Sequence, residues 1–178
     1  IHGVVLLAFA VLLAVRAFAE ERVAGTWPLL RGSPLSDREI TLGKYFGVMA
    51  TVGVQSLISG YLPALVLIHG RVSPLHVLVG YAGALGLASV GTSVGLWASS
   101  QTARQVYAAA LSALMLVPLL AASRVSAVVD APFRGIVAYA SVVERHQNTW
   151  SAGQANSETV ALYGTLTFVF LLMATQSL

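Results

Sequence analysis

The side chains that could do chemistry in this sequence are few and dispersed. Histidine is the commonest metal ligand and proton carrier near neutral pH, and the four histidines are His2, His69, His76 and His146. His69 and His76 fall in one short segment and could share a metal ion there, but no H-E-x-x-H motif accompanies them. Serines and threonines within apolar helices usually bond their own backbone rather than act as nucleophiles. We therefore expect neither a metal site nor a catalytic residue.

Residues 41–44, Thr-Leu-Gly-Lys, superficially match the end of a phosphate-binding loop. That loop requires a glycine five positions before Gly43 and a serine or threonine after Lys44. Those positions hold Arg38 and Tyr45. We therefore expect the chain to bind no cofactor of its own, and any ATP-driven work would need a second polypeptide to hydrolyse the nucleotide.

The composition is that of a protein whose solvent is lipid. Hydrophobic residues make up 57% of the 178 residues and charged residues 10%, with a mean hydropathy of +0.79, whereas soluble domains carry about 25% charged residues. No cysteine is present, which excludes disulfides and thiolate sites. The net charge of +3 comes from ten basic residues scattered among apolar segments, which argues against a nucleic-acid partner.

Five apolar segments are long enough to cross a membrane, for which a helix needs roughly 20 residues. The sequence predicts an all-α polytopic membrane protein with spans at about 1–19, 45–68, 75–99, 105–123 and 159–178. The first span starts without a methionine inside an apolar run, so we expect an N-terminally truncated fragment. Residues 1–19 end like a signal-peptidase site, but Arg16 within the run favours a span. Pro63 and Pro118 predict kinks.

Basic residues predict the orientation of these spans. Six of them fall on one side of an alternating topology, namely Arg16, Arg22, Arg31, Arg38, Lys44 and Arg104. Four fall on the other side, namely Arg71, Arg124, Arg134 and Arg145. Because positive charge marks the cytoplasmic side, and five of the six crowd around the first loop, that loop is predicted to be cytoplasmic.

The first loop, residues 20–44, holds eight of the 17 charged residues. Its turn residues predict order: Thr26 can cap a short amphipathic turn that Gly32 ends in a left-handed conformation. Ser36 and Glu39 have capping-box spacing at the start of the next helix. The pattern predicts a rigid helix–corner–helix unit, called here the elbow (residues 20–44), which could contact a soluble partner or simply connect two spans.

Two further stretches predict packing and surface structure. Small residues in G-x-x-x-G spacing allow helices to approach closely in lipid, and the third span carries Gly80, Gly83, Gly86, Gly91 and Gly95. We expect them chiefly to pack helices within the chain, with a dimer face or a wall of a substrate path as the alternatives. Residues 124–157 are too interrupted to span and predict short extracytoplasmic helices.

The elbow sequence resembles the signature region of type-two ABC transporter permeases, particularly the gliding-motility-associated and related multi-span permeases. The matching positions run in order through Glu20, Glu21, Arg22, Gly25, Thr26, Leu29, Leu30, Ser33, Pro34, Leu35, Ser36, Asp37, Ile40, Leu42, Gly43 and Lys44. The other spans fit less specifically, and together the likeness covers nearly the whole chain. Pro28 departs from the pattern, where family members often have glutamate.

The resemblance implies that residues 1–178 form a single transmembrane permease domain of a bacterial or archaeal cytoplasmic membrane, and that the full chain has six spans with the elbow between the second and the third. It implies a coupling helix within the elbow that contacts a separate ATPase subunit, which would hold ATP and Mg²⁺, and a second permease subunit as a further partner. The candidate coupling residues are Glu20, Glu21, Arg22, Gly25, Thr26, Ser33, Pro34, Ser36, Asp37, Arg38, Glu39 and Lys44.

Two other functions stay open. One is an ATP-independent structural or channel-like membrane subunit. The other is a membrane metal-handling protein using His69, His76 and His146.

Overall fold

The computed structural model describes residues 2–69, 73–126, 150 and 156–178, and within these ranges all regular structure is helical. The helices are α1 (His2–Ala14), α2 (Arg16–Ala24), α3 (Trp27–Arg31), α4 (Asp37–Ser59), α5 (Tyr61–His69), α6 (Pro74–Gln101), α7 (Gln105–Ser126) and α10 (Ser157–Gln176). Most of the predicted 124–157 segment falls outside the described residues.

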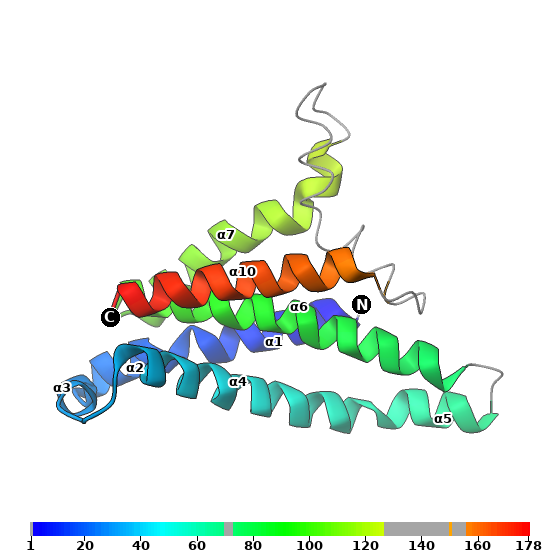
Figure 1. Ribbon diagram of the computed structural model, residues 1–178, viewed down its shortest axis with the longest axis horizontal. Coiled ribbons are helices and arrows are strands. Elements are labelled where there is room, and N and C mark those ends of the chain that lie inside the picture. Colours follow the sequence, from blue (N-terminus) through cyan, green and yellow to red (C-terminus); the bar gives the residue numbers. More distant parts are fainter. Residues whose placement is uncertain (1, 70–72, 127–149, 151–155) are drawn as a thin grey trace.

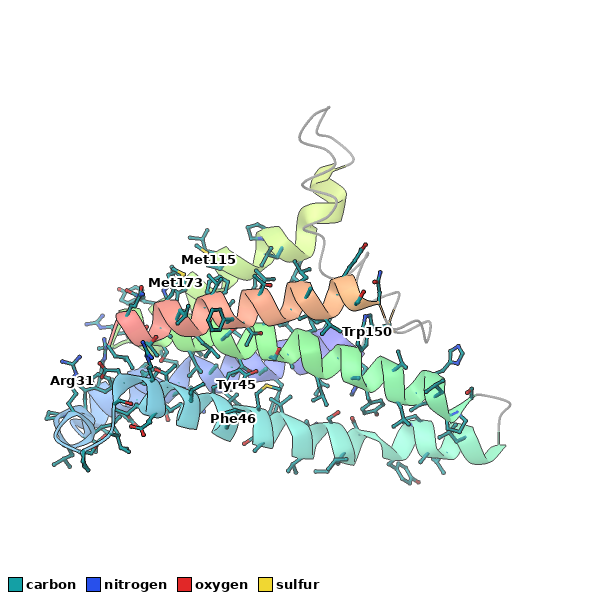
Figure 2. All side chains as sticks on the ribbon, viewed as in Figure 1. Arg31, Tyr45, Phe46, Met115, Trp150 and Met173 are labelled. Carbon is teal, nitrogen blue, oxygen red and sulfur yellow. The ribbon has the colours of Figure 1, made fainter. Side chains whose placement is uncertain are left out.

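Helix α6 is the centre of the bundle (Figure 1). Helix α1 packs along it most extensively, and α10, α7 and α4 pack on its other sides. The elbow, the C-terminal end of α6 and the C-terminus of the chain all lie at the same end of the bundle. In Figure 2, Arg31 lies at this elbow end, whereas Trp150 lies toward the opposite end.

Four helices are long and apolar enough to cross a membrane: His2–Ala24, Asp37–Leu65, Pro74–Gln101 and Ser157–Gln176. They overlap four of the five predicted spans, although the first extends beyond residue 19 to Ala24 and the second begins at Asp37 rather than at residue 45. The predicted span at 105–123 corresponds to α7, whose apolar part, Gln105–Ala121, is shorter than the other four. Large apolar side chains are exposed along the outer faces, including Phe46, Leu57, Leu114 and Phe168. An aqueous surface disfavours so much exposed apolar area, so these faces fit a lipid environment.

Two glycines of α6 form its contact with α1, as the G-x-x-x-G spacing predicts. A Cβ atom added at Gly95 would lie 2.6 Å from the Cβ atom of Ala14, and one added at Gly91 would overlap Leu7. Gly83 and Gly86 face Trp150 and Tyr163 in the same close manner. Gly83, Gly86, Gly91 and Gly95 therefore make close contacts within the chain.

The joint between α1 and α2 is held by Ser99, a buried serine of α6. Its hydroxyl donates to the Val15 carbonyl oxygen at 2.9 Å and accepts from the backbone amides of Phe18 and Ala19, both at 3.0 Å. A hydroxyl has one donor and two acceptor positions, so Ser99 uses all three. The side chain thereby interrupts the ladder of backbone bonds that would make α1 and α2 one straight helix.

Proline accounts for the break between α4 and α5. Pro63 has no amide hydrogen and cannot donate to the Ser59 carbonyl one turn earlier, and α4 ends at Ser59. The last amide bonded to α4 is that of Gly60, which donates to the Ser56 and Leu57 carbonyls at 3.1 and 3.0 Å. Pro118 lies inside α7, which bends away from the bundle in its C-terminal half (Figure 1).

Candidate functional site

The elbow is ordered by a glycine turn at the end of α2. Gly25 has a φ of 72°, the left-handed conformation that glycine adopts without steric cost. The amides of Gly25 and Thr26 both donate to the Glu21 carbonyl oxygen, the latter at 3.0 Å. This turn satisfies the last backbone carbonyls of α2 and directs the chain into α3.

Two sequence predictions about the ends of α3 are wrong. The Thr26 side chain does not cap α3, because its hydroxyl points back to the Glu21 carbonyl at 3.3 Å. Gly32 is right-handed, with a φ of −79°. The Ser33 hydroxyl donates to the Leu30 carbonyl at 2.6 Å, and this bond satisfies the end of α3 without a left-handed residue.

The capping box at the start of α4 is confirmed. The Ser36 amide donates to Glu39 Oε2 at 2.8 Å, and the Ser36 hydroxyl accepts from the Glu39 amide at 3.4 Å. Each residue thus satisfies an amide of the other that helix formation leaves without a partner. From this box α4 continues without interruption for 23 residues to Ser59, a rise of roughly 34 Å.

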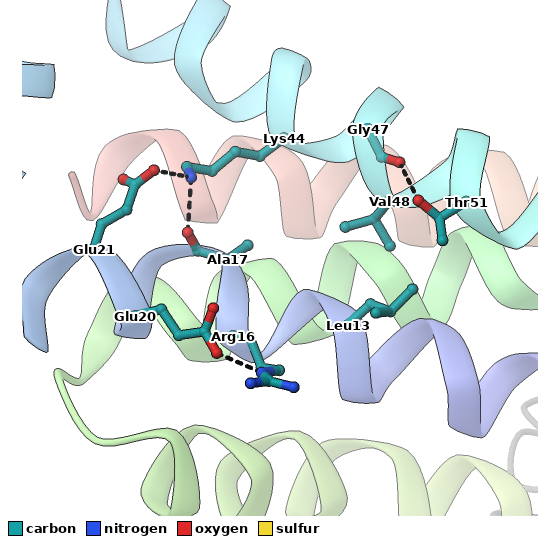
Figure 3. Close-up of a pocket in the computed structure, with 9 residues that line it drawn as sticks. All are labelled: Leu13, Arg16, Ala17, Glu20, Glu21, Lys44, Gly47, Val48 and Thr51. Carbon is teal, nitrogen blue, oxygen red and sulfur yellow. Dashed lines mark hydrogen bonds and ion pairs between the residues drawn. The ribbon is translucent and has the colours of Figure 1, made fainter. Parts of the chain in front are cut away.

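Lys44 ties α4 to α2 (Figure 3). Its ammonium group donates to Glu21 Oε1 at 2.5 Å and to the Ala17 carbonyl oxygen at 2.7 Å, and it lies 5.1 Å from the centre of the Phe18 ring. The side chains of Lys44 and Glu21 are only 19% and 29% exposed. Such a sheltered, charge-assisted contact is stronger than a surface ion pair, so the two helices are held together at the elbow end.

A groove of about 500 Å³ runs beside this contact, between α1, α2 and α4. Its charged lining residues are Arg16, Glu20, Glu21 and Lys44. Arg16 pairs with Glu20 one turn away, and Lys44 pairs with Glu21. All four charges are therefore compensated within the chain (Figure 3).

Trp27 fixes the short helix α3 against the bundle. The guanidinium groups of Arg22 and Arg31 lie 5.0 and 5.7 Å from its ring centre, and the Phe18 ring meets it edge-on at 5.9 Å. Trp27 also packs on the core cluster that contains Phe18 and Ile40. Cation–π and aromatic contacts of this kind each contribute about 0.5–1.5 kcal/mol.

Three large apolar side chains of the elbow are left uncovered. Val23 is 75% exposed, Leu29 76% and Leu35 50%. The side chains of Asp37 and Arg38 make no hydrogen bond or ion pair with any described residue. The elbow thus exposes apolar residues as well as charges that the described part of the chain does not pair.

Of the twelve predicted coupling residues, four lie in the turns on either side of α3, namely Gly25, Thr26, Ser33 and Pro34. The other eight fall into two groups. The structure joins Glu21 to Lys44, Ser36 to Glu39, and Arg22 to Trp27. Glu20 lies on the exposed side of α2 with Arg16, and Asp37 and Arg38 begin α4. Sequence reasoning missed two residues. Ala17 accepts from Lys44 through its backbone oxygen, and Ser99 bonds to the joint at Val15, which is distant in sequence.

The sequence Gly-Thr-Ser-Val-Gly, residues 91–95, has the spacing of a serine nucleophile elbow, but its setting differs. That motif needs a sharp strand-to-helix turn that exposes the serine. Here it lies within α6, and the buried Ser93 hydroxyl donates to the Val90 carbonyl at 2.8 Å. Thr92 likewise bonds the Ala88 carbonyl. The back-bonding predicted for serines and threonines in the spans is confirmed at these positions.

The hypothesis of a metal site at the histidines finds no supporting arrangement among the described residues. Among them no group of three histidine, cysteine or acidic side chains could hold a metal ion. His76 is exposed at the start of α6, and His146 lies outside the described ranges. Comparison of the chain with family models, curated proteins and solved structures finds no match.

Proposed function

We propose that this chain is the transmembrane permease subunit of an ABC transporter, working in a bacterial or archaeal cytoplasmic membrane with a separate ATPase subunit. The observation that carries the proposal is the construction of the elbow. It is capped at both turns, fixed to the bundle through Trp27 and Lys44, and exposes large apolar side chains at Val23, Leu29 and Leu35. The ordered resemblance of its sequence to permease signatures supports the same function.

The elbow is built to transmit force in this proposal. A push on α3 reaches α4 through residues 32–36, which the Ser36–Glu39 box fixes to the start of α4, and it passes from α4 to α2 through the Lys44 contact with Glu21. Helix α4 carries the displacement across the bundle as one rigid rod, because its first break is at Gly60. ATPase closure would thereby become a rigid-body movement of spans, a known form of gating transition.

Charge reversal at Glu39 tests the proposal. We expect Glu39→Lys to leave membrane insertion intact but to lower the ATPase activity of the purified complex by about tenfold, which corresponds to ~1.4 kcal/mol in the barrier. The reversal removes one half of the capping box and places a cation at the positive end of the α4 dipole. The measurement is ATP hydrolysis by complexes purified from native membranes in mild detergent.

The matched control is Glu158→Lys, which reverses another acidic residue in the first turn of a long helix, α10, near the opposite end of the bundle. We expect it to leave hydrolysis within twofold of the wild-type rate. Equal effects of the two reversals, or undiminished hydrolysis with Glu39→Lys, would refute a coupling role for the elbow.

A further inference from the structure

A second groove, of about 410 Å³, lies between α4 and α10 at the elbow end. Its floor is apolar, formed by Leu42, Phe168, Leu171 and Leu172. Phe168 and Leu42 are 63% and 43% exposed, so the groove is open to its surroundings.

The groove becomes polar toward the end of the bundle. Arg38 lines its mouth, and a neighbouring depression adds Asp37, Ser36 and Gln176. From Thr175 to Phe168 is seven residues of helix, so the apolar floor extends roughly 10 Å inward from the mouth. This sequence of a charged mouth and an apolar floor follows the polarity of a bilayer leaflet.

The mouth carries one positive and one negative group, and both lack partners among the described residues. The unpaired charges of Arg38 and Asp37 differ from those of the groove beside Lys44, where every charged lining residue is paired. A guanidinium group is suited to a phosphate, and a carboxylate accepts hydrogen bonds from an ammonium. A ligand with an apolar tail, a phosphate and a primary ammonium would match the apolar floor, Arg38 and Asp37, respectively.

We propose that this groove binds a phosphatidylethanolamine molecule. Its phosphate would lie on Arg38, its ammonium on Asp37, and one acyl chain along Leu42, Leu172 and Phe168. The charges favour this lipid over its relatives. Phosphatidylglycerol has no cation for Asp37, and the quaternary ammonium of phosphatidylcholine has no hydrogen to donate.

Native mass spectrometry of the purified chain with an equimolar mixture of these three lipids, each with the same acyl chains, tests the proposal. We expect phosphatidylethanolamine to be retained about threefold more than either relative, the size of one partly solvated ion pair. Asp37→Asn should abolish the preference over phosphatidylglycerol. Arg38→Ala should lower retention of all three lipids, and Leu172→Trp, which fills the groove, should do the same.

Two variants provide the controls. Arg104→Ala removes an exposed arginine from the loop between α6 and α7 at the same end of the bundle, and Leu114→Trp enlarges an exposed residue of α7. Neither should alter lipid retention. Equal retention of the three lipids by the unmodified chain, or retention unchanged by Leu172→Trp, would overturn the proposal.

Discussion

Gly95→Ala is expected to destabilise the bundle by about 1–3 kcal/mol, the usual cost of overpacking a core. The new methyl carbon would lie 2.6 Å from Ala14 Cβ and 3.3 Å from the Val11 carbonyl oxygen, although non-bonded heavy atoms prefer roughly 3.5–4.0 Å. The Val11 oxygen belongs to the α1 backbone and cannot rotate away, so α1 and α6 must separate. Unfolding of the purified protein in mixed micelles measures the loss.

Gly53→Ala is the matched control for this prediction. Gly53 also lies within a long helix, α4, but a Cβ atom there would meet nothing within 4 Å. Alanine should be neutral or stabilising at that position by up to about 1 kcal/mol, because it favours helix. Ala14→Gly should restore part of the stability lost in Gly95→Ala. Equal stability of the Gly95 and Gly53 variants would contradict the close contact between α1 and α6.

Lys44→Met is expected to lower the free energy of unfolding by about 1–3 kcal/mol, because it leaves a sheltered carboxylate and a carbonyl oxygen without their donor. The substitution keeps an unbranched, similarly long side chain, so the effect reports the lost contacts with Glu21 and Ala17. In the proposed mechanism it also separates the movement of α2 from that of α4.

Arg16→Met is the matched control for Lys44→Met, since it breaks the other ion pair that lines the same groove. The side chains of Arg16 and Glu20 are each 55% exposed, so the loss should stay below about 1 kcal/mol. The double variant Lys44→Met with Glu21→Gln should lose much less stability than the sum of the losses in the two single variants, because the two residues share one contact. Full additivity would mean that the pair contributes nothing.

Local patterns in the sequence predict much of this structure. Four helices long and apolar enough to cross a membrane follow from the length of the apolar segments. The capping box follows from the three-residue spacing of Ser36 and Glu39. Both signals depend only on neighbours along the chain. Which of Gly25 and Gly32 adopts the left-handed conformation does not follow from such local patterns. Both glycines come after a short helix, and the Ser33 hydroxyl satisfies the second end in a way that spacing does not reveal.

Contacts between distant residues mark the other limit of prediction. Ser99 is one of many serines in an apolar chain, and only the packing of α6 on α1 brings it to the joint at Val15. Lys44 reads from the sequence as a charge at the membrane boundary, but its partners lie 23 and 27 residues earlier. The G-x-x-x-G spacing predicts that Gly91 and Gly95 form a contact, yet not which helix they meet.

Site-specific cross-linking from the elbow tests the proposed coupling role most directly. The chain has no cysteine, so Leu29→Cys places a single reactive thiol on the exposed face of α3. Leu57→Cys is the control, because Leu57 is similarly exposed, 81% against 76%, but lies well along α4 within a candidate membrane span. With a thiol-reactive photo-cross-linker in native membranes, we expect an adduct with a phosphate-loop ATPase from position 29 and none from position 57. Failure to form that adduct at position 29, or equal yields at both positions, would contradict the assignment of the elbow as the ATPase contact.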